Sequence, residues 1–154
     1  MLLHVVLLVL HLLAATFWVG GMAAMYFAAR TAAAAVLEPP ARLAFMSNAL
    51  TRFFGGVQVA LAVLFLSGIG MYFLVGGFSG VHWRIYAMFG VAVVMAGVFD
   101  LARKRPLPAL QRAVAASDWK NAADRLNEIR RLVAVNLGLG VAVYAIAIVG
   151  RAIN

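Results

Sequence analysis

Two histidines and a tryptophan recur at seven-residue spacing near the start of the chain. They are His4, His11 and Trp18, with Met25 one further step along. Because an α-helix drifts only about 20° per seven residues, the four side chains share one face of a helix. Imidazole and thioether groups bind copper, and imidazole also binds haem iron inside aromatic pockets. The spacing therefore predicts a stripe of ligand-type side chains along a single helix.

The elements that must position this stripe are membrane helices. The chain is 66% hydrophobic and 12% charged, whereas soluble domains are about 25% charged. A helix needs about 20 apolar residues to span a bilayer, and four runs are long enough, at about 3–29, 53–75, 85–102 and 132–150. The first run is too long for a signal-peptide core and has no basic region before it, so we expect it to remain as a span. We expect one integral membrane domain over residues 1–154.

Basic residues gather in two of the three connections between these runs. Of the 13 in the chain, three surround the first connection and eight fill the third. The positive-inside rule therefore places these two connections in the cytoplasm and both termini outside it, in a bacterial-type inner (plasma) membrane. This placement accounts for the net charge of +8 without a nucleic-acid partner.

The predicted fold class is all-α: a four-transmembrane-helix bundle with a cytoplasmic amphipathic extension before the fourth helix. We expect the first helix to continue to about residue 36, because Pro39 and Pro40 cannot extend it but can begin the next helix. Ser117 is the expected N-cap of the extension. Apolar residues then repeat at helical spacing up to Leu132, where the fourth span begins.

This topology puts all three histidines of the chain on the outer side of the membrane. His4 and His11 lie in the outer half of the first helix, and His82 begins the third helix on the same side. His4 and His82 also suit a wet interface near a helix end. His11 lies two to three turns inside the membrane, where an ionisable group is costly and indicates a functional site.

One chemistry that fits is b-type haem. His11 would be the axial ligand, and His82 or His4 is the candidate second ligand. His4 and His11 cannot both bind one iron, because they project from the same face about two turns apart. Trp18 would form a wall of the haem pocket, and Arg84 would pair with the propionates.

The other chemistry is copper binding. The chain has no cysteine, so disulfides, iron–sulfur clusters and thiolate sites are excluded. Copper would then be bound by His11, His4 and His82 together with nearby methionines such as Met88.

Three further polar residues lie within the predicted spans. Asp100 has Arg103 and Lys104 within helical reach, so we expect a local ion pair. Gln58 and Asn136 are expected to form hydrogen bonds between helices.

The segment from His11 through Trp18 and Gly20-Gly21 to Met22 resembles the first helix of the CopD-like membrane proteins, which are associated with copper resistance or uptake. It is also similar to the HemJ-type protoporphyrinogen oxidases, small helical membrane proteins thought to bind b-type haem through a first-helix histidine. HemJ-type proteins carry a lysine in the third helix, where this chain has Arg84 and Met88.

The leading functional hypothesis is a membrane-embedded b-type haem protein for electron transfer, or a haem-dependent oxidoreductase acting on a membrane-accessible substrate. Its partners would be the lipid bilayer and a redox partner or quinone, and a homodimer suits so small a bundle. The alternatives are a CopD-like copper transport or resistance protein, and a scaffold subunit without catalytic activity.

Overall fold

The structure, a computed structural model, describes residues 1–76 and 82–152, with side chains as far as residue 149. Four helical stretches in this part of the chain are long and apolar enough to cross a membrane: Leu2–Val36, Pro39–Leu74, Trp83–Ala115 and Trp119–Val149. The predicted all-α fold with four spans is confirmed.

The first span is one long helix with a change of winding inside it. It consists of α1 (Leu2–Ala23), a π-helical segment η1 (Ala24–Ala29) and α2 (Arg30–Val36). The second span, α3, covers Pro39–Leu74. The expected break at the proline pair is confirmed, because the first span ends at Val36 and α3 begins with proline in its first turn.

The third connection contains a helix that the sequence analysis did not anticipate. The third span, α4, covers Trp83–Lys104, and α5 follows at Pro106–Ala115. Pro106 lacks an N–H and cannot continue α4, but it suits the first turn of a new helix. One face of α5 is buried, and it carries Leu107, Leu110 and Ala113 at helical spacing.

The last helix, α6, covers Trp119–Ala152, so the single long helix that joins the amphipathic extension to the fourth span is confirmed. The predicted N-cap was wrong by one residue. Ser117 has a positive φ of 55° and lies in the turn before the helix. Asp118 takes the capping role, because its Oδ1 accepts a hydrogen bond of 3.1 Å from the Asn121 N–H.

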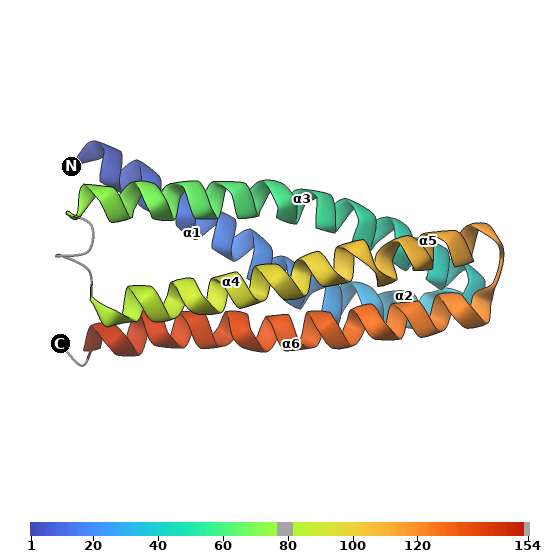
Figure 1. The fold of residues 1–154 in the computed structure, drawn as a ribbon. Coiled ribbons are helices and arrows are strands. Elements are labelled where there is room, and N and C mark those ends of the chain that lie inside the picture. Colours follow the sequence, from blue (N-terminus) through green and yellow to red (C-terminus); the bar gives the residue numbers. More distant parts are fainter. Residues whose placement is uncertain (77–81, 153–154) are drawn as a thin grey trace.

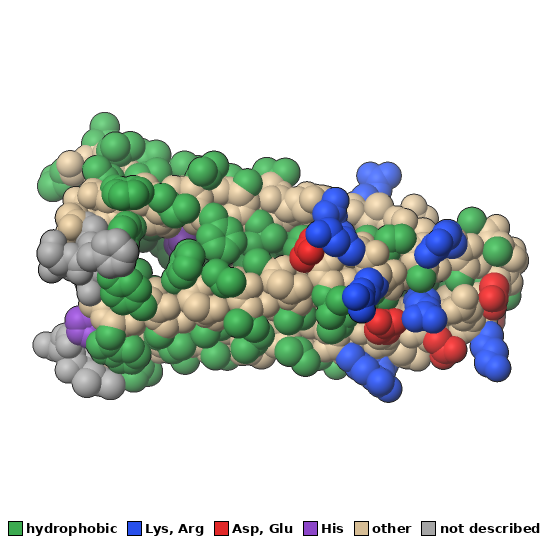
Figure 2. All heavy atoms as spheres, viewed as in Figure 1, with side chains coloured by type: hydrophobic (Ala, Val, Ile, Leu, Met, Phe, Trp, Pro, Cys, Tyr) green, Lys and Arg blue, Asp and Glu red, His purple; other side chains and the backbone are tan. Residues whose placement is uncertain are grey.

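The helices form two pairs that run side by side in an elongated bundle (Figure 1). α1 packs mainly against α3, and α4 packs mainly against α6. Both chain termini lie at one end of the bundle, called the terminal end below. The other end holds α2, α5 and the first half of α6. Figure 2 shows Lys and Arg side chains over this half, so we call it the basic end.

The best-packed part of the interior lies between the middle of the bundle and the basic end. Val57, Leu110 and Ile129 are fully buried there, and the Phe99 ring makes edge contacts with the Trp18 and Phe54 rings at centroid distances of 6.3 and 5.1 Å. Towards the terminal end, exposed apolar side chains cover α1, as expected for a surface in contact with lipid.

Of the three polar residues Asp100, Gln58 and Asn136, one forms an ion pair, one is exposed and one is buried. Lys104 Nζ lies 2.8 Å from Asp100 Oδ2, so the expected ion pair is confirmed. Gln58 is exposed on the outside of α3 and has no hydrogen bond within the described residues, so its predicted role was wrong. Asn136 is buried, but its Oδ1 has no hydrogen-bond partner in the part of the chain that the structure describes.

Candidate functional site

His11 lies on the face of α1 that packs against α3. Its Nδ1 is 3.0 Å from the Leu64 carbonyl oxygen and 3.1 Å from Ser67 Oγ. The ring rests on Gly68, where a Cβ atom would lie 3.2 Å from His11 Cε1. The absence of a side chain at position 68 therefore lets the imidazole approach the α3 backbone.

These contacts determine which ring nitrogen of His11 carries the proton. A carbonyl oxygen only accepts hydrogen bonds, so Nδ1 must donate to Leu64. Ser67 donates its own hydroxyl proton to the Val63 carbonyl oxygen at 2.6 Å, which leaves its oxygen free to accept from the imidazole. His11 is thus held in the tautomer whose lone pair is on Nε2.

Nε2 is the atom of His11 that is available for binding. It has no hydrogen bond in the described residues, and it is not enclosed by the protein. Histidines that bind metals almost always donate the other ring N–H to a carbonyl or carboxylate, which fixes the ring and makes the binding nitrogen more basic. The arrangement at His11 has this form.

His4 lies two turns from His11 on the same helix, nearer the terminal end, and is half-buried. His82 takes the N-cap position of α4, with its ring centroid 6.0 Å from that of Trp83. Arg84 and Met88 follow within α4, and both are half-buried. Within residues 1–76 and 82–152, no three His, Asp or Glu side chains form a group able to hold a metal ion. The three histidines therefore do not share one preformed metal centre.

Trp18 is part of the packed interior and is only 2% exposed. Besides its contact with Phe99, it borders a small cavity of about 10 Å³ that Asn136 also lines. Trp18 Nε1 and Asn136 Oδ1 are buried without a hydrogen-bond partner among the described residues. The structure thus places Trp18 deeper in the bundle than His11, in the aromatic core.

The two helix pairs diverge towards the terminal end (Figure 1). Figure 2 shows an opening there between the α1–α3 pair and the α4–α6 pair. Nearer the middle of the bundle, the Thr16 and Tyr144 hydroxyls, 3.5 Å apart, connect α1 with α6.

The sequence analysis missed Ser67 and Gly68, which place the His11 ring. A serine within the apolar run Phe65-Leu66-Ser67-Gly68-Ile69 was the available signal, because hydroxyls inside membranes commonly bind groups on neighbouring helices. The facing register of α1 and α3, which makes Ser67 the partner of His11, is a property of the folded bundle.

The comparisons with known proteins give one match. The sequence model of a family described as copper resistance protein D matches residues 47–149. No curated protein and no solved structure matches the chain. The matched segment contains Ser67, His82 and Met88, and it begins after the helix that carries His4 and His11.

Proposed function

Because the chain belongs to the copper resistance protein D family, we propose that it binds copper ions within the membrane and passes them along the bundle. The observation that carries the proposal, beside family membership, is the state of His11. Its Nδ1–H is donated to the Leu64 carbonyl oxygen, and its Nε2 is unbonded and accessible. A neutral imidazole held in this way is a ready ligand for a copper ion.

The chemistry of the donors favours Cu(I). Imidazole nitrogen and thioether sulfur are the copper-binding groups of a chain without cysteine. Met71 lies one turn from Ser67 on α3, and His4 lies two turns from His11 on α1, both towards the terminal end. The ion would meet these donors in turn, and a series of neighbouring sites lets a bound ion move from one to the next.

His82 and Met88 form the second part of the proposal. Both lie at the start of α4, at the same end of the bundle as His4, and both fall within the segment that matches the family. We propose that they receive or deliver copper across the opening between the two helix pairs. Transfer between donors on separate helices agrees with the lack of a closed three-ligand group in the described part of the chain.

The proposal includes an orientation. The terminal end would face the outside of the cell and the basic end the cytoplasm, in a multi-pass inner-membrane protein, because Lys and Arg are enriched in cytoplasmic connections. Copper would then enter or leave on the outer side, through the end that carries the histidines.

Haem b is the second candidate, and one observation favours it. An axial haem ligand also needs a free Nε2 with Nδ1–H donated to a neighbour, as His11 has. Family membership favours copper over haem.

The test is metal binding by the purified protein and two variants. Protein loaded with Cu(I) under reducing conditions and desalted is expected to retain copper, as measured by elemental analysis. His11→Ala removes the proposed ligand and is expected to lose most of the bound copper. Gln58→Ala is the matched control, because Gln58 is an exposed polar residue of the bundle without a described contact.

Copper retained equally by His11→Ala and Gln58→Ala would refute the assignment of His11. An absorption spectrum of the same samples separates the two candidates. A strong Soret band that disappears in His11→Ala, in protein that retains no copper, would support haem in place of copper.

A further inference from the structure

A cavity lies at the basic end of the bundle, away from the histidines. It has a volume of about 300 Å³ and lies between the first span, α3 and α6. Three arginines line it, one from each helix: Arg30, Arg42 and Arg130. Arg30 and Arg42 are half-buried and Arg130 is exposed, so the cavity is accessible from the surface.

The positive charge of this cavity is not neutralised by the protein. None of the five acidic residues of the chain lines it. The ion pairs of the described residues are Lys104–Asp100 and Arg125–Glu128, so the three cavity arginines have no carboxylate partner there. Three unpaired guanidinium groups around one cavity attract an anion and repel a copper ion.

Arg30 is held in place by Tyr26. Its Nε donates a hydrogen bond of 3.4 Å to the Tyr26 carbonyl oxygen, and its guanidinium carbon lies 5.2 Å from the centre of the Tyr26 ring. Tyr26 and Met25 both line the cavity and belong to the π-helical segment η1. π-helical turns occur frequently at functional sites, and here one forms a wall of the cavity.

The cavity lining is mixed at the basic end and apolar nearer the membrane. The arginines and Asn127 lie towards the basic end among apolar side chains such as Leu43 and Leu126. Met25, Leu50 and Val133 lie further along their helices towards the membrane-spanning part. A small soluble anion would make no favourable contact with the apolar part of the lining. A phospholipid has both an anionic phosphate and an apolar chain, in this order and at this depth.

From this combination we infer that the cavity binds the headgroup of an anionic phospholipid. The phosphate is held by Arg30, Arg42 and Arg130, since guanidinium groups bind phosphate oxygens through paired hydrogen bonds. The first part of the lipid chain lies against the apolar lining. Basic cavities between membrane helices bind anionic lipid headgroups in this way, and the site is independent of copper binding at His11.

The experiment is a lipid titration of the whole protein in detergent, followed by native mass spectrometry. The probes are phosphatidylglycerol and phosphatidylcholine with the same acyl chains. Phosphatidylglycerol is expected to bind at least about tenfold more tightly, because its headgroup carries net negative charge. Arg30→Gln, Arg42→Gln and Arg130→Gln are each expected to weaken phosphatidylglycerol binding about fivefold. They should weaken phosphatidylcholine binding less, because choline offsets the charge of its phosphate.

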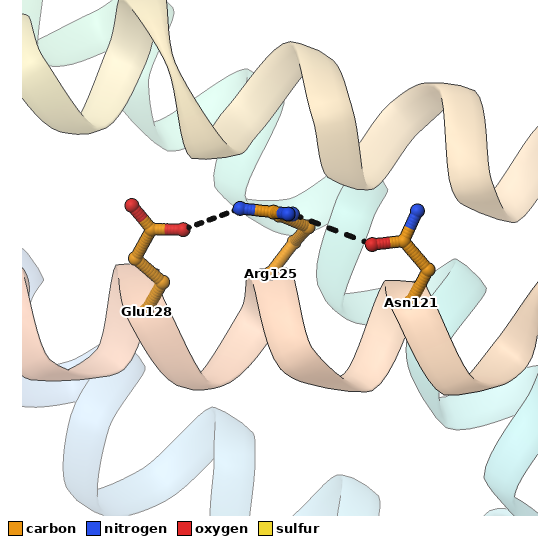
Figure 3. Close-up of polar contacts among 3 residues, drawn as sticks. All are labelled: Asn121, Arg125 and Glu128. Carbon is orange, nitrogen blue, oxygen red and sulfur yellow. Dashed lines mark hydrogen bonds and ion pairs between the residues drawn. The ribbon is translucent and has the colours of Figure 1, made fainter.

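Arg125→Gln is the matched control. Arg125 lies on α6, five residues before Arg130, but it does not line the cavity. Figure 3 shows Arg125 between Glu128, at 3.0 Å, and Asn121, at 3.4 Å. The control removes the same unit charge as Arg130→Gln, from a position outside the site. It is expected to bind phosphatidylglycerol like the unmodified protein.

Two results would overturn the inference. If Arg125→Gln weakens phosphatidylglycerol binding as much as Arg130→Gln, the lipid senses the general charge of this end and not the cavity. If glycerol phosphate displaces phosphatidylglycerol at equal concentration, the ligand is a soluble phosphate compound and not a lipid. Because Arg130 is exposed, Arg130→Gln keeps the test valid even where a half-buried arginine cannot be replaced.

Discussion

Replacing Gly68 by alanine should weaken copper binding although it replaces none of the proposed copper ligands. An added Cβ at this position would lie 3.2 Å from His11 Cε1 and 3.5 Å from His11 Nδ1. Carbon atoms pack best at about 3.5–4.0 Å, so the imidazole must move away from α3 by about 0.3 Å or more. The α3 backbone cannot yield as easily, because it is part of a continuous helix.

This displacement acts on the hydrogen bonds that hold the ring. The Nδ1 distances to Leu64 O and Ser67 Oγ are 3.0 and 3.1 Å, and a shift of about 0.3 Å takes both beyond the usual upper limit of about 3.2 Å. Loss of such a supporting hydrogen bond typically lowers metal affinity about 10- to 100-fold. The bonds of His11 are weakened and not removed, so we expect a loss of about three- to tenfold in Cu(I) affinity.

The assay is competition for Cu(I) with a chromophoric chelator. Gly55→Ala is the control, because it lies on the same helix and an added Cβ there meets nothing within 4 Å. Both substitutions favour the helical backbone by the same amount, about 1 kcal/mol, so the two variants differ in the contact with His11. Equal Cu(I) affinity of the two variants would refute the argument that Gly68 and the α3 backbone position the ligand.

Three more predictions concern the bundle itself. Asn136→Leu is expected to raise the midpoint of thermal unfolding, because it removes a buried unpaired carbonyl oxygen whose burial costs about 1–3 kcal/mol; a lower midpoint would mean that this oxygen is paired. Asp118→Ala is expected to lower the free energy of unfolding by about 1 kcal/mol through loss of the α6 cap, followed by circular dichroism in detergent, and no change would contradict the cap. For orientation, the cysteine-free chain allows single-cysteine labelling of intact cells with an impermeant maleimide. Leu2→Cys should react and Ser117→Cys should not, and the reverse pattern would invert the proposed topology.

Most of the fold could be predicted from hydropathy and proline positions. The four spans are long uniform apolar runs, and Pro39-Pro40 marks the boundary between the first two helices in the sequence as in the structure. The features that were missed depend on local or tertiary detail. The change to π-helical winding at Ala24–Ala29 leaves no mark in an apolar sequence, and α5 is defined by packing of Leu107 and Leu110 against neighbouring helices.

The candidate site could be predicted only in part. The predicted depth of His11 in the membrane was sufficient to select it as a candidate site residue, because an imidazole at that depth is energetically costly. Its tautomer could not be predicted, since this depends on the Leu64 carbonyl oxygen and on the register of α1 against α3. The arginine cavity was missed for a similar reason. Arg30, Arg42 and Arg130 contributed to the orientation argument as single charges, and only the bundle brings helices from three parts of the chain around one space.

His11 lies outside the segment that matches the family, whereas the groups that hold its ring lie inside it. The family match covers residues 47–149 and contains Leu64 and Ser67, the partners of the His11 Nδ1. In this structure α3 therefore supplies the hydrogen-bond acceptors for the imidazole that α1 carries. Without the His11 ring, the Ser67 hydroxyl would bond only within α3, and the space beside Gly68 would be left unfilled. The second span thus supplies the hydrogen-bond partners of the proposed copper ligand. The register of α3 against α1 determines whether these partners hold the His11 Nδ1 and leave Nε2 free to bind copper.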